Sequence, residues 1–94
     1  MKEAKKIGRA LLEEKLAACV NKIDKIESNY WWEGKIETAK ECLLLIKTEK
    51  KWVKRLIKRV KELHSYAVPE VIACPIVAGN PDYLNWIAKS GKEV

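Results

Sequence analysis

The feature that most constrains the fold is a stretch of thirty residues, 19–48, in which two strands are joined by a turn at Gly34. Residues 19–27 mix β-branched and polar side chains, which is typical of a half-buried strand. The returning strand ends in the run 42–46, which is apolar on both faces and suits a strand covered on both sides. Because this hairpin takes about a third of the 94 residues, only a few other elements can accompany it.

Helices are expected on both sides of the hairpin. In the segment 3–17, apolar residues fall on one half of a helical wheel and charged residues lie mostly opposite them, which predicts an amphipathic helix. After the hairpin, Thr48 can cap a second helix over residues 49–64. The apolar stripe of this second helix is typical of a helix that packs on a core.

The last third of the chain predicts one more strand and one more helix. Residues 71–77 are apolar, and Pro75 places that strand at a sheet edge or a strand end because proline has no N–H. Asn80 and Pro81 open a last helix that stops at Gly91. The order of elements matches a split βαβ (ferredoxin-like) fold from its second element onward and lacks the first strand. Residues 1–94 therefore predict a single α+β domain with two helices on one sheet face.

Composition excludes several classes of protein. An apolar fraction of 48% with four Trp excludes a disordered chain, and no apolar run reaches the ~20 residues that span a bilayer. The chain starts with a charged amphipathic segment rather than a signal peptide, so a cytoplasmic protein without a membrane partner is expected. Cys19, Cys42 and Cys74 are an odd set without a close pair, which favours reduced thiols. Of these, Cys42 and Cys74 are expected to be small core residues.

The second helix concentrates the positive charge. Seven basic side chains lie between residues 50 and 61 and fill one side of this helix. Such a stripe could follow nucleic-acid phosphates. The alternative is a solvated, lysine-rich face, which we favour because Trp52 lies on the apolar side and nucleic-acid binders usually add aromatics beside the basic residues. Nucleic acid is therefore the least favoured partner.

His64 is the single histidine and lies where the second helix ends. As a metal ligand it would need partners from elsewhere, such as Glu70 or a cysteine thiolate, and a Cys–His set would suit copper or zinc. The alternative is a helix-end histidine that caps backbone carbonyls, and spacing alone favours this alternative. No glycine-rich phosphate loop, nucleophile elbow or HExxH motif occurs in the sequence, so no enzymatic activity is expected.

Aromatic residues gather beside the hairpin turn. Trp31 and Trp32 are adjacent on a strand, so their side chains must point to opposite faces. One small domain cannot easily bury both faces of a protruding hairpin, and an exposed apolar patch there would mark a partner surface. Self-association would also stabilise a chain of this size. The alternative is that one Trp packs in the core and the other lies on the surface.

Several segments together resemble the CutA divalent-cation tolerance family, in the family's order and spacing and over nearly the whole chain. The WWEGK segment at 31–35 and the HxYxxPE segment at 64–70 are the most specific of them. The matching segments are 15–21, 30–37, 44–48, 63–72 and 83–87.

The resemblance implies a ferredoxin-like subunit, related in architecture to the PII signalling proteins, that assembles as a compact homotrimer. It also implies a role in tolerance of divalent metals, notably copper. Carried over by position, the residues of the clefts between subunits would be Tyr30, Trp32, Tyr66, Glu70, Tyr83 and Trp86.

Two departures from the family pattern change these expectations. The family begins with a strand, whereas this chain starts inside the first helix, so we expect either a shortened chain start or a sheet completed from another segment or subunit. Of the copper ligands implied by part of the family, only His64 is carried over. Any inner-sphere metal, Cu²⁺ or another divalent cation, is therefore expected to use His64 with Glu70 or Cys19.

The leading hypothesis is a cytoplasmic homotrimer that binds divalent metal weakly or acts as a stress-related scaffold. The alternative is a PII-like module that binds a small ligand or a signalling protein in the clefts between subunits. A nucleic-acid binder using the second helix is the third hypothesis.

Overall fold

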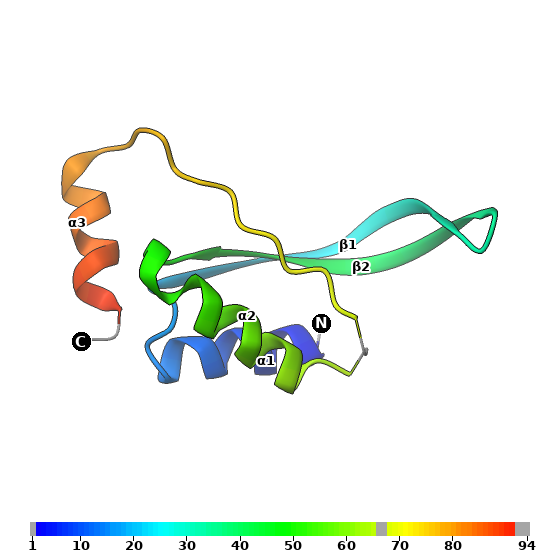
Figure 1. Ribbon diagram of the computed structural model, residues 1–94, viewed down its shortest axis with the longest axis horizontal. Coiled ribbons are helices and arrows are strands. Elements are labelled where there is room, and N and C mark those ends of the chain that lie inside the picture. Colours follow the sequence, from blue (N-terminus) through cyan, green and yellow to red (C-terminus); the bar gives the residue numbers. More distant parts are fainter. Residues whose placement is uncertain (1, 66–67, 92–94) are drawn as a thin grey trace.

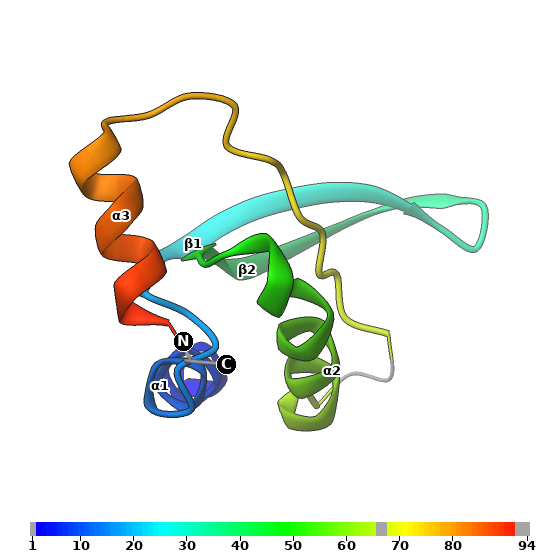
Figure 2. The same ribbon diagram turned by 60° about the vertical axis from the view of Figure 1, so that its left-hand side comes forward.

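The computed structural model describes residues 2–65 and 68–91 and has an α+β fold. β1 and β2 pair antiparallel in a two-stranded sheet. Figures 1 and 2 show α1 and α2 on one face of this sheet, α3 beside its base, and the hairpin tip projecting beyond the helices. No helix in the described ranges is long and apolar enough to cross a membrane. The elements are α1 (Lys2–Glu13), β1 (Cys19–Trp32), β2 (Lys35–Lys47), the short 3₁₀ helix η1 (Lys50–Trp52), α2 (Val53–Leu63) and α3 (Pro81–Ser90).

The hairpin prediction is confirmed, and the two strands are joined by a two-residue turn. Trp32 pairs with Lys35, so only Glu33 and Gly34 connect the strands. Both have positive φ, 49° and 78° respectively, as a type I′ turn requires. This turn type matches the right-handed twist of the strands it joins, which explains why so long a hairpin stays paired to its end.

A β-bulge interrupts β1 near its middle. Ile23 pairs with Leu43 and Ile26 with Glu41, so two residues of β1 stand opposite one of β2. Lys25 takes the left-handed conformation, with φ of 58°, and its N–H donates to Asp24 Oδ1 at 2.9 Å. Bulges bend a strand and increase its twist. The bulge therefore lies where the hairpin leaves the helix-covered base and enters its exposed outer half (Figure 1).

The first helix ends earlier than predicted, at Glu13 rather than near residue 17. Lys15 is left-handed, with φ of 58°, and two backbone bonds close the end: Lys15 N–H to Leu12 O at 3.0 Å and Leu16 N–H to Leu11 O at 2.9 Å. This is a Schellman motif, in which Leu16 packs with Leu11. The prediction was wrong because a lysine stands where glycine usually marks such an end.

The start of the second helix also differs from the prediction. Residues 50–52 form η1, α2 follows, and Glu49, not Thr48, is the capping position, without a side-chain cap bond. The Thr48 hydroxyl instead donates to Leu16 O at 2.7 Å. Thr48 therefore joins the end of β2 to the loop after α1, a contact 32 residues away in sequence that no local pattern reveals.

One hydrophobic core lies between α1, α2 and the base of the hairpin. Its buried members come from α1, α2 and the loop after α1, while Val20, Leu44 and Ile46 of the sheet pack against them. Leu11 is the most deeply placed, with no exposed surface. The buried residues of this cluster are Ile7, Leu11, Leu16, Ala17, Leu56 and Val60.

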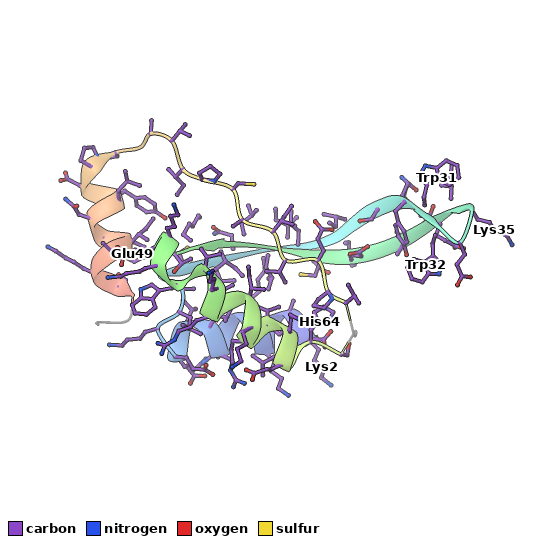
Figure 3. All side chains as sticks on the ribbon, viewed as in Figure 1. Lys2, Trp31, Trp32, Lys35, Glu49 and His64 are labelled. Atoms are coloured by element: carbon purple, nitrogen blue, oxygen red, sulfur yellow. The ribbon has the colours of Figure 1, made fainter. Side chains whose placement is uncertain are left out.

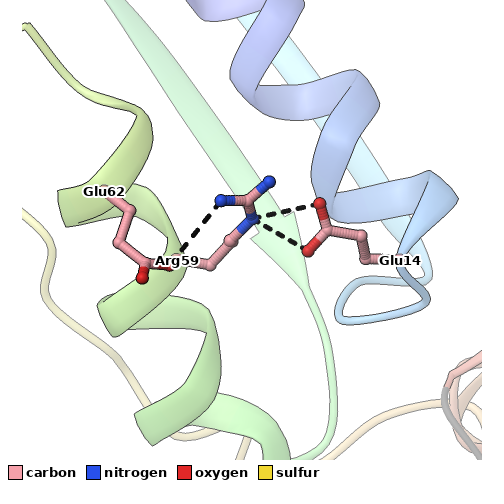
Figure 4. Close-up of polar contacts among 3 residues, drawn as sticks. All are labelled: Glu14, Arg59 and Glu62. Carbon is pink, nitrogen blue, oxygen red and sulfur yellow. Dashed lines mark hydrogen bonds and ion pairs between the residues drawn. The ribbon is translucent and has the colours of Figure 1, made fainter.

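A polar contact joins the two helices beside this core. Arg59 Nε of α2 donates to both carboxylate oxygens of Glu14, at 2.9 and 3.0 Å, and its Nη1 lies 3.6 Å from Glu62 Oε1 (Figure 4). The bonds from Glu14 raise the pKa of the Arg59 guanidinium above its usual value. These side chains are partly exposed, so the contact mainly aligns the helices and adds little to stability.

The predicted third strand is wrong for the described chain. Residues 71–77 are extended, but the sheet contains β1 and β2 alone among the described residues. Cys74 is exposed rather than a core residue. The last helix is as predicted: Asn80 Oδ1 accepts from Asp82 N–H at 3.0 Å, Pro81 is the first helical residue, and Gly91 follows the end. The α+β class is therefore confirmed with a smaller sheet than expected.

Two leucines of α1 test the position of the core. Leu11→Ala should lower the free energy of unfolding by about 2–5 kcal/mol, because a fully buried leucine leaves a cavity. The neighbouring Leu12 is 40% exposed. Leu12→Ala should therefore lower the free energy of unfolding by less than about 1 kcal/mol. Urea unfolding at one protein concentration measures both. Equal losses would contradict this placement of the core.

Candidate functional site

His64 lies at the C-terminal end of α2, next to the start of α1. Its N–H donates the last helical hydrogen bond, to Val60 O at 2.8 Å, and its extended backbone ends the helix. The following residue, Ser65, donates from its N–H and its hydroxyl to the Glu3 carboxylate, at 2.6 and 3.1 Å. Figure 3 shows Lys2 and His64 near each other, at the end of the helical layer that is nearer the hairpin tip. The structure therefore brings a histidine and a carboxylate close together from positions 61 residues apart in sequence.

The environment of Glu3 favours its ionised form. The two bonds from Ser65 lower the pKa of the Glu3 carboxyl below its usual value, and the nearby His64 and Lys6 charges act in the same direction. A carboxylate held in this form is a ready ligand for a divalent cation. Nothing in the sequence pattern pointed to Glu3, because its partners lie about sixty residues away.

The predicted metal ligands do not all meet in one chain. Glu70 is exposed and lies six residues after His64, in the segment that leaves α2. Cys19 starts β1 and pairs with Lys47, near the N-terminal end of α2. His64 lies at the other end of α2, which has 11 residues and is about 16 Å long. Over residues 2–65 and 68–91, no group of three His, Cys, Asp or Glu side chains could hold a metal ion.

Cys19 has a basic neighbour instead. Lys47 Nζ lies 3.9 Å from Cys19 Sγ and also donates to Asn21 Oδ1, while the thiol lies 3.8 Å from that same oxygen. The Lys47 ammonium would compete with a metal cation for this sulfur. A metal site that used both Cys19 and His64 would need two chains.

The hairpin tip carries exposed aromatic residues on both faces. Trp31 pairs with Ile36, and Trp32 pairs with Lys35, so the two indoles point to opposite sides, as Figure 3 shows. Trp31 is 73% and Trp32 61% exposed. The alternative in which one of them packs in the core is wrong for the single chain. Tyr30, on the same face as Trp32, is also exposed.

The other predicted cleft aromatics lie at the far end of the molecule. Tyr83 and Trp86 of α3 stack on each other, with ring centroids 5.6 Å apart and planes at 28°, and both are exposed. The chain is 45 Å long, and α3 and the hairpin tip lie at opposite ends of it (Figure 1). Tyr66, the remaining predicted cleft residue, lies outside the described residues. One chain therefore does not assemble this cleft by itself.

The sheet face opposite the helices carries a second apolar patch. Leu44 and Ile46 face the core, so Leu43 and Leu45 face the other way. Ile23 pairs with Leu43 on that face. These three side chains are each between 40% and 47% exposed. An exposed apolar sheet face of this kind is typical of a contact surface.

The basic side of α2 is solvated, as the favoured interpretation predicts. Lys50, Lys51, Lys54, Arg55, Lys58 and Lys61 are exposed. Trp52 is buried, and its ring lies below the charges of Lys51 and Arg55, at 5.3 and 5.8 Å. Its indole is therefore engaged within the chain and does not offer a stacking surface to a base.

Two helices on one face of a long antiparallel hairpin, with aromatic and apolar surfaces left exposed, define a small α+β protein. A family model described as "CutA1 divalent ion tolerance protein" matches residues 1–90. The chain belongs to this family.

Relatives and solved structures agree with this assignment. The chain is 46% identical over 87 residues to the divalent-cation tolerance protein CutA of Thermus thermophilus, covering 93% of this chain and 84% of that protein. It is 52% identical over 93 residues to the chloroplastic CutA 1 of Oryza sativa, covering 98% and 52% respectively. The solved structure of the Thermus protein matches with a TM-score of 0.93, at 44% identity, over 97% of this chain and 88% of that one. CutA1 from Oryza sativa matches with a TM-score of 0.95, at 48% identity, over 100% and 86%.

The extent of these matches differs among relatives. The chain spans about half the length of the rice and mouse proteins, 52% and 49% respectively, and 84% of the proteins from Thermus thermophilus and Archaeoglobus fulgidus. The rice protein is described as chloroplastic and the solved Archaeoglobus protein as periplasmic. Cellular location therefore does not follow from the family.

The Glu3–Ser65 contact predicts a pH dependence of stability. Folding lowers the pKa of the Glu3 carboxyl. The contact therefore contributes its full stabilisation at pH values above the pKa that Glu3 has in the unfolded chain. This stabilisation is lost as the pH falls through the lower pKa that Glu3 has in the folded chain. In metal-free buffer, wild type should lose stability relative to Glu3→Gln as pH is lowered from about 6 to 3. The control is Glu13→Gln, in the same helix, whose carboxylate contacts only Arg9, at 3.8 Å, among the described residues. A constant difference between wild type and Glu3→Gln across this range would contradict the contact.

Proposed function

We propose that this protein acts in divalent-cation tolerance as a non-enzymatic, cytoplasmic homotrimer that binds a divalent metal weakly. The observation that carries the metal part is the position of His64 close to the Glu3 carboxylate, which accepts two hydrogen bonds from the adjacent Ser65. The family match supplies the connection to divalent ions.

The chemistry of this end suits weak binding. A neutral imidazole and one or two carboxylates form a mixed nitrogen–oxygen set that suits copper and zinc. Glu70 can add a second carboxylate, since it is exposed and lies in the segment that follows His64. Few protein ligands and an open, solvated position mean that water fills the remaining positions around the ion.

Copper titration tests the metal part. His64→Ala should weaken Cu²⁺ binding by at least about tenfold, because it removes the one imidazole from the set. Cys19→Ala is the matched control at the other end of α2 and should leave the affinity unchanged. Calorimetry and copper electron paramagnetic resonance at pH 7 measure both variants. Equal affinity of wild type and His64→Ala would remove His64 from the site.

Two surfaces support the homotrimer. The patch of Ile23, Leu43 and Leu45 lies on the sheet face that no helix covers among the described residues. The aromatics of the predicted cleft lie at opposite ends of one chain, so they can share a cleft only where one chain's hairpin tip meets another chain's α3. A ring of three such contacts closes on itself and buries each patch. In the alternative, PII-like function, the stacked Tyr83 and Trp86 would line the ligand cleft.

Solution mass tests the trimer. Leu43→Asp should shift the mass measured by light scattering from three chains toward one, because it places a charge in an apolar contact. Lys58→Asp, on the solvated side of α2, is the control and should keep the trimer. A wild type that is monomeric at micromolar concentration would reject this assembly.

A further inference from the structure

The positive charge of the chain is concentrated in its helical layer. Residues 2–15 and 49–64, which contain α1, η1 and α2, hold twelve basic and five acidic side chains. The rest of the chain holds seven basic and eight acidic side chains. The net charge of +6 therefore comes from one layer of the fold.

Most of the basic side chains on α2 and η1 have no carboxylate partner. Arg59 pairs with Glu14 and Glu62, and Lys51 lies 3.8 Å from Glu49. Like charges four residues apart repel each other on a helix, so an acidic partner would relieve a repulsion that the free chain keeps. The side chains that are exposed and form no ion pair with another described residue are Lys50, Lys54, Arg55, Lys58 and Lys61.

An open hollow with an apolar centre lies among three of these lysines. Its volume is about 380 Å³, and all of its lining residues belong to α2. Ile57 is partly buried and is the apolar member of that lining. Lys54, Lys58 and Lys61 stand around it, and Glu62 completes the lining. A side chain that enters this hollow therefore meets an aliphatic surface surrounded by ammonium groups.

We propose that this side of α2 binds an acidic segment of another protein, which places one apolar side chain against Ile57 and its carboxylates against the surrounding lysines. The homotrimer proposed above uses the uncovered sheet face, the hairpin tip and α3. This side of α2 therefore remains open to a partner in the assembly as well as in the single chain.

An acidic protein segment fits better than nucleic acid. Proteins that hold single strands combine a basic groove with aromatic side chains on which the bases stack, whereas the indole of Trp52 is buried. The phosphate backbone also offers no aliphatic group for the hollow. Charge complementarity and the apolar centre together favour a polypeptide.

The recognised segment is short. Lys54 and Lys61 are seven residues apart, which corresponds to about 10 Å along the helix axis. An extended peptide covers this length with about three residues. The partner class is therefore one apolar residue with acidic residues on both sides of it.

A synthetic peptide tests the hollow. The probe has one leucine between two runs of three glutamates and carries a fluorescent label for anisotropy. Serine in place of the leucine should weaken binding at least about fivefold, because the apolar contact is lost. Glutamines in place of the glutamates should weaken it at least about tenfold, because the charge attraction is lost. Absence of binding by the probe, or equal binding of the leucine and serine peptides, would overturn the proposal.

Protein variants locate the binding. Ile57→Ser should weaken the probe at least about fivefold, and Lys61→Glu, at an exposed position, at least about tenfold. Lys5→Glu is the matched control, since it makes the same change in net charge at an exposed lysine of α1. At about 0.15 M salt, where distant charges are screened, it should change the affinity less than about threefold. Equal losses in Lys61→Glu and Lys5→Glu would reject the site, whether or not the chain binds copper.

Two other polyanions test the class of partner. A single-stranded oligonucleotide and vesicles that contain phosphatidylserine compete with the bound probe, each at the same concentration of negative charge as the unlabelled peptide. The unlabelled peptide should displace the probe at the lowest concentration, because it alone combines carboxylates with the leucine. Displacement at a lower concentration by the oligonucleotide or by the vesicles would assign this side of α2 to nucleic acid or to a membrane surface, and the proposal would fail.

Discussion

The packing of Leu11 and its neighbours between α1, α2 and the hairpin base is the interaction on which the rest of the structure depends. Without it, a two-stranded sheet would not be stable in water by itself. The core is small and sits at one end of the hairpin. The tip, the residues that follow Val71 and the outer face of the sheet therefore remain outside it, and these parts carry exposed apolar side chains.

Contacts between segments that are distant in sequence fix how the elements around the core are placed relative to one another. Thr48 bonds to the loop after α1, Arg59 bonds to Glu14, and Ser65 bonds to Glu3. Each joins residues 32 to 62 positions apart in sequence. The last of these also places a carboxylate beside His64. The same contact thus ties the start of α1 to the end of α2, beside the histidine for which we propose a role in cation binding.

Local patterns were sufficient to predict the hairpin, the last helix and the outward direction of both tryptophans. They failed where the decisive partner is distant. Thr48 has the chemistry of a cap but bonds elsewhere, and Lys15 ends a helix in a conformation that glycine usually supplies. Residues 71–77 have a strand's composition without a strand's partner. For the candidate site, His64 was found from the sequence, whereas Glu3 required the folded chain.

The bulge in β1 has a consequence for the far end of the hairpin. Side chains alternate along a strand, so one extra residue exchanges the faces of every residue that follows it. Because the bulge at Asp24 and Lys25 precedes the tip, it decides that Trp32 shares a face with Leu43 while Trp31 lies opposite. The bulge near the core thereby sets which face of the sheet each indole occupies at the tip, about 20 Å away at 3.3 Å per residue.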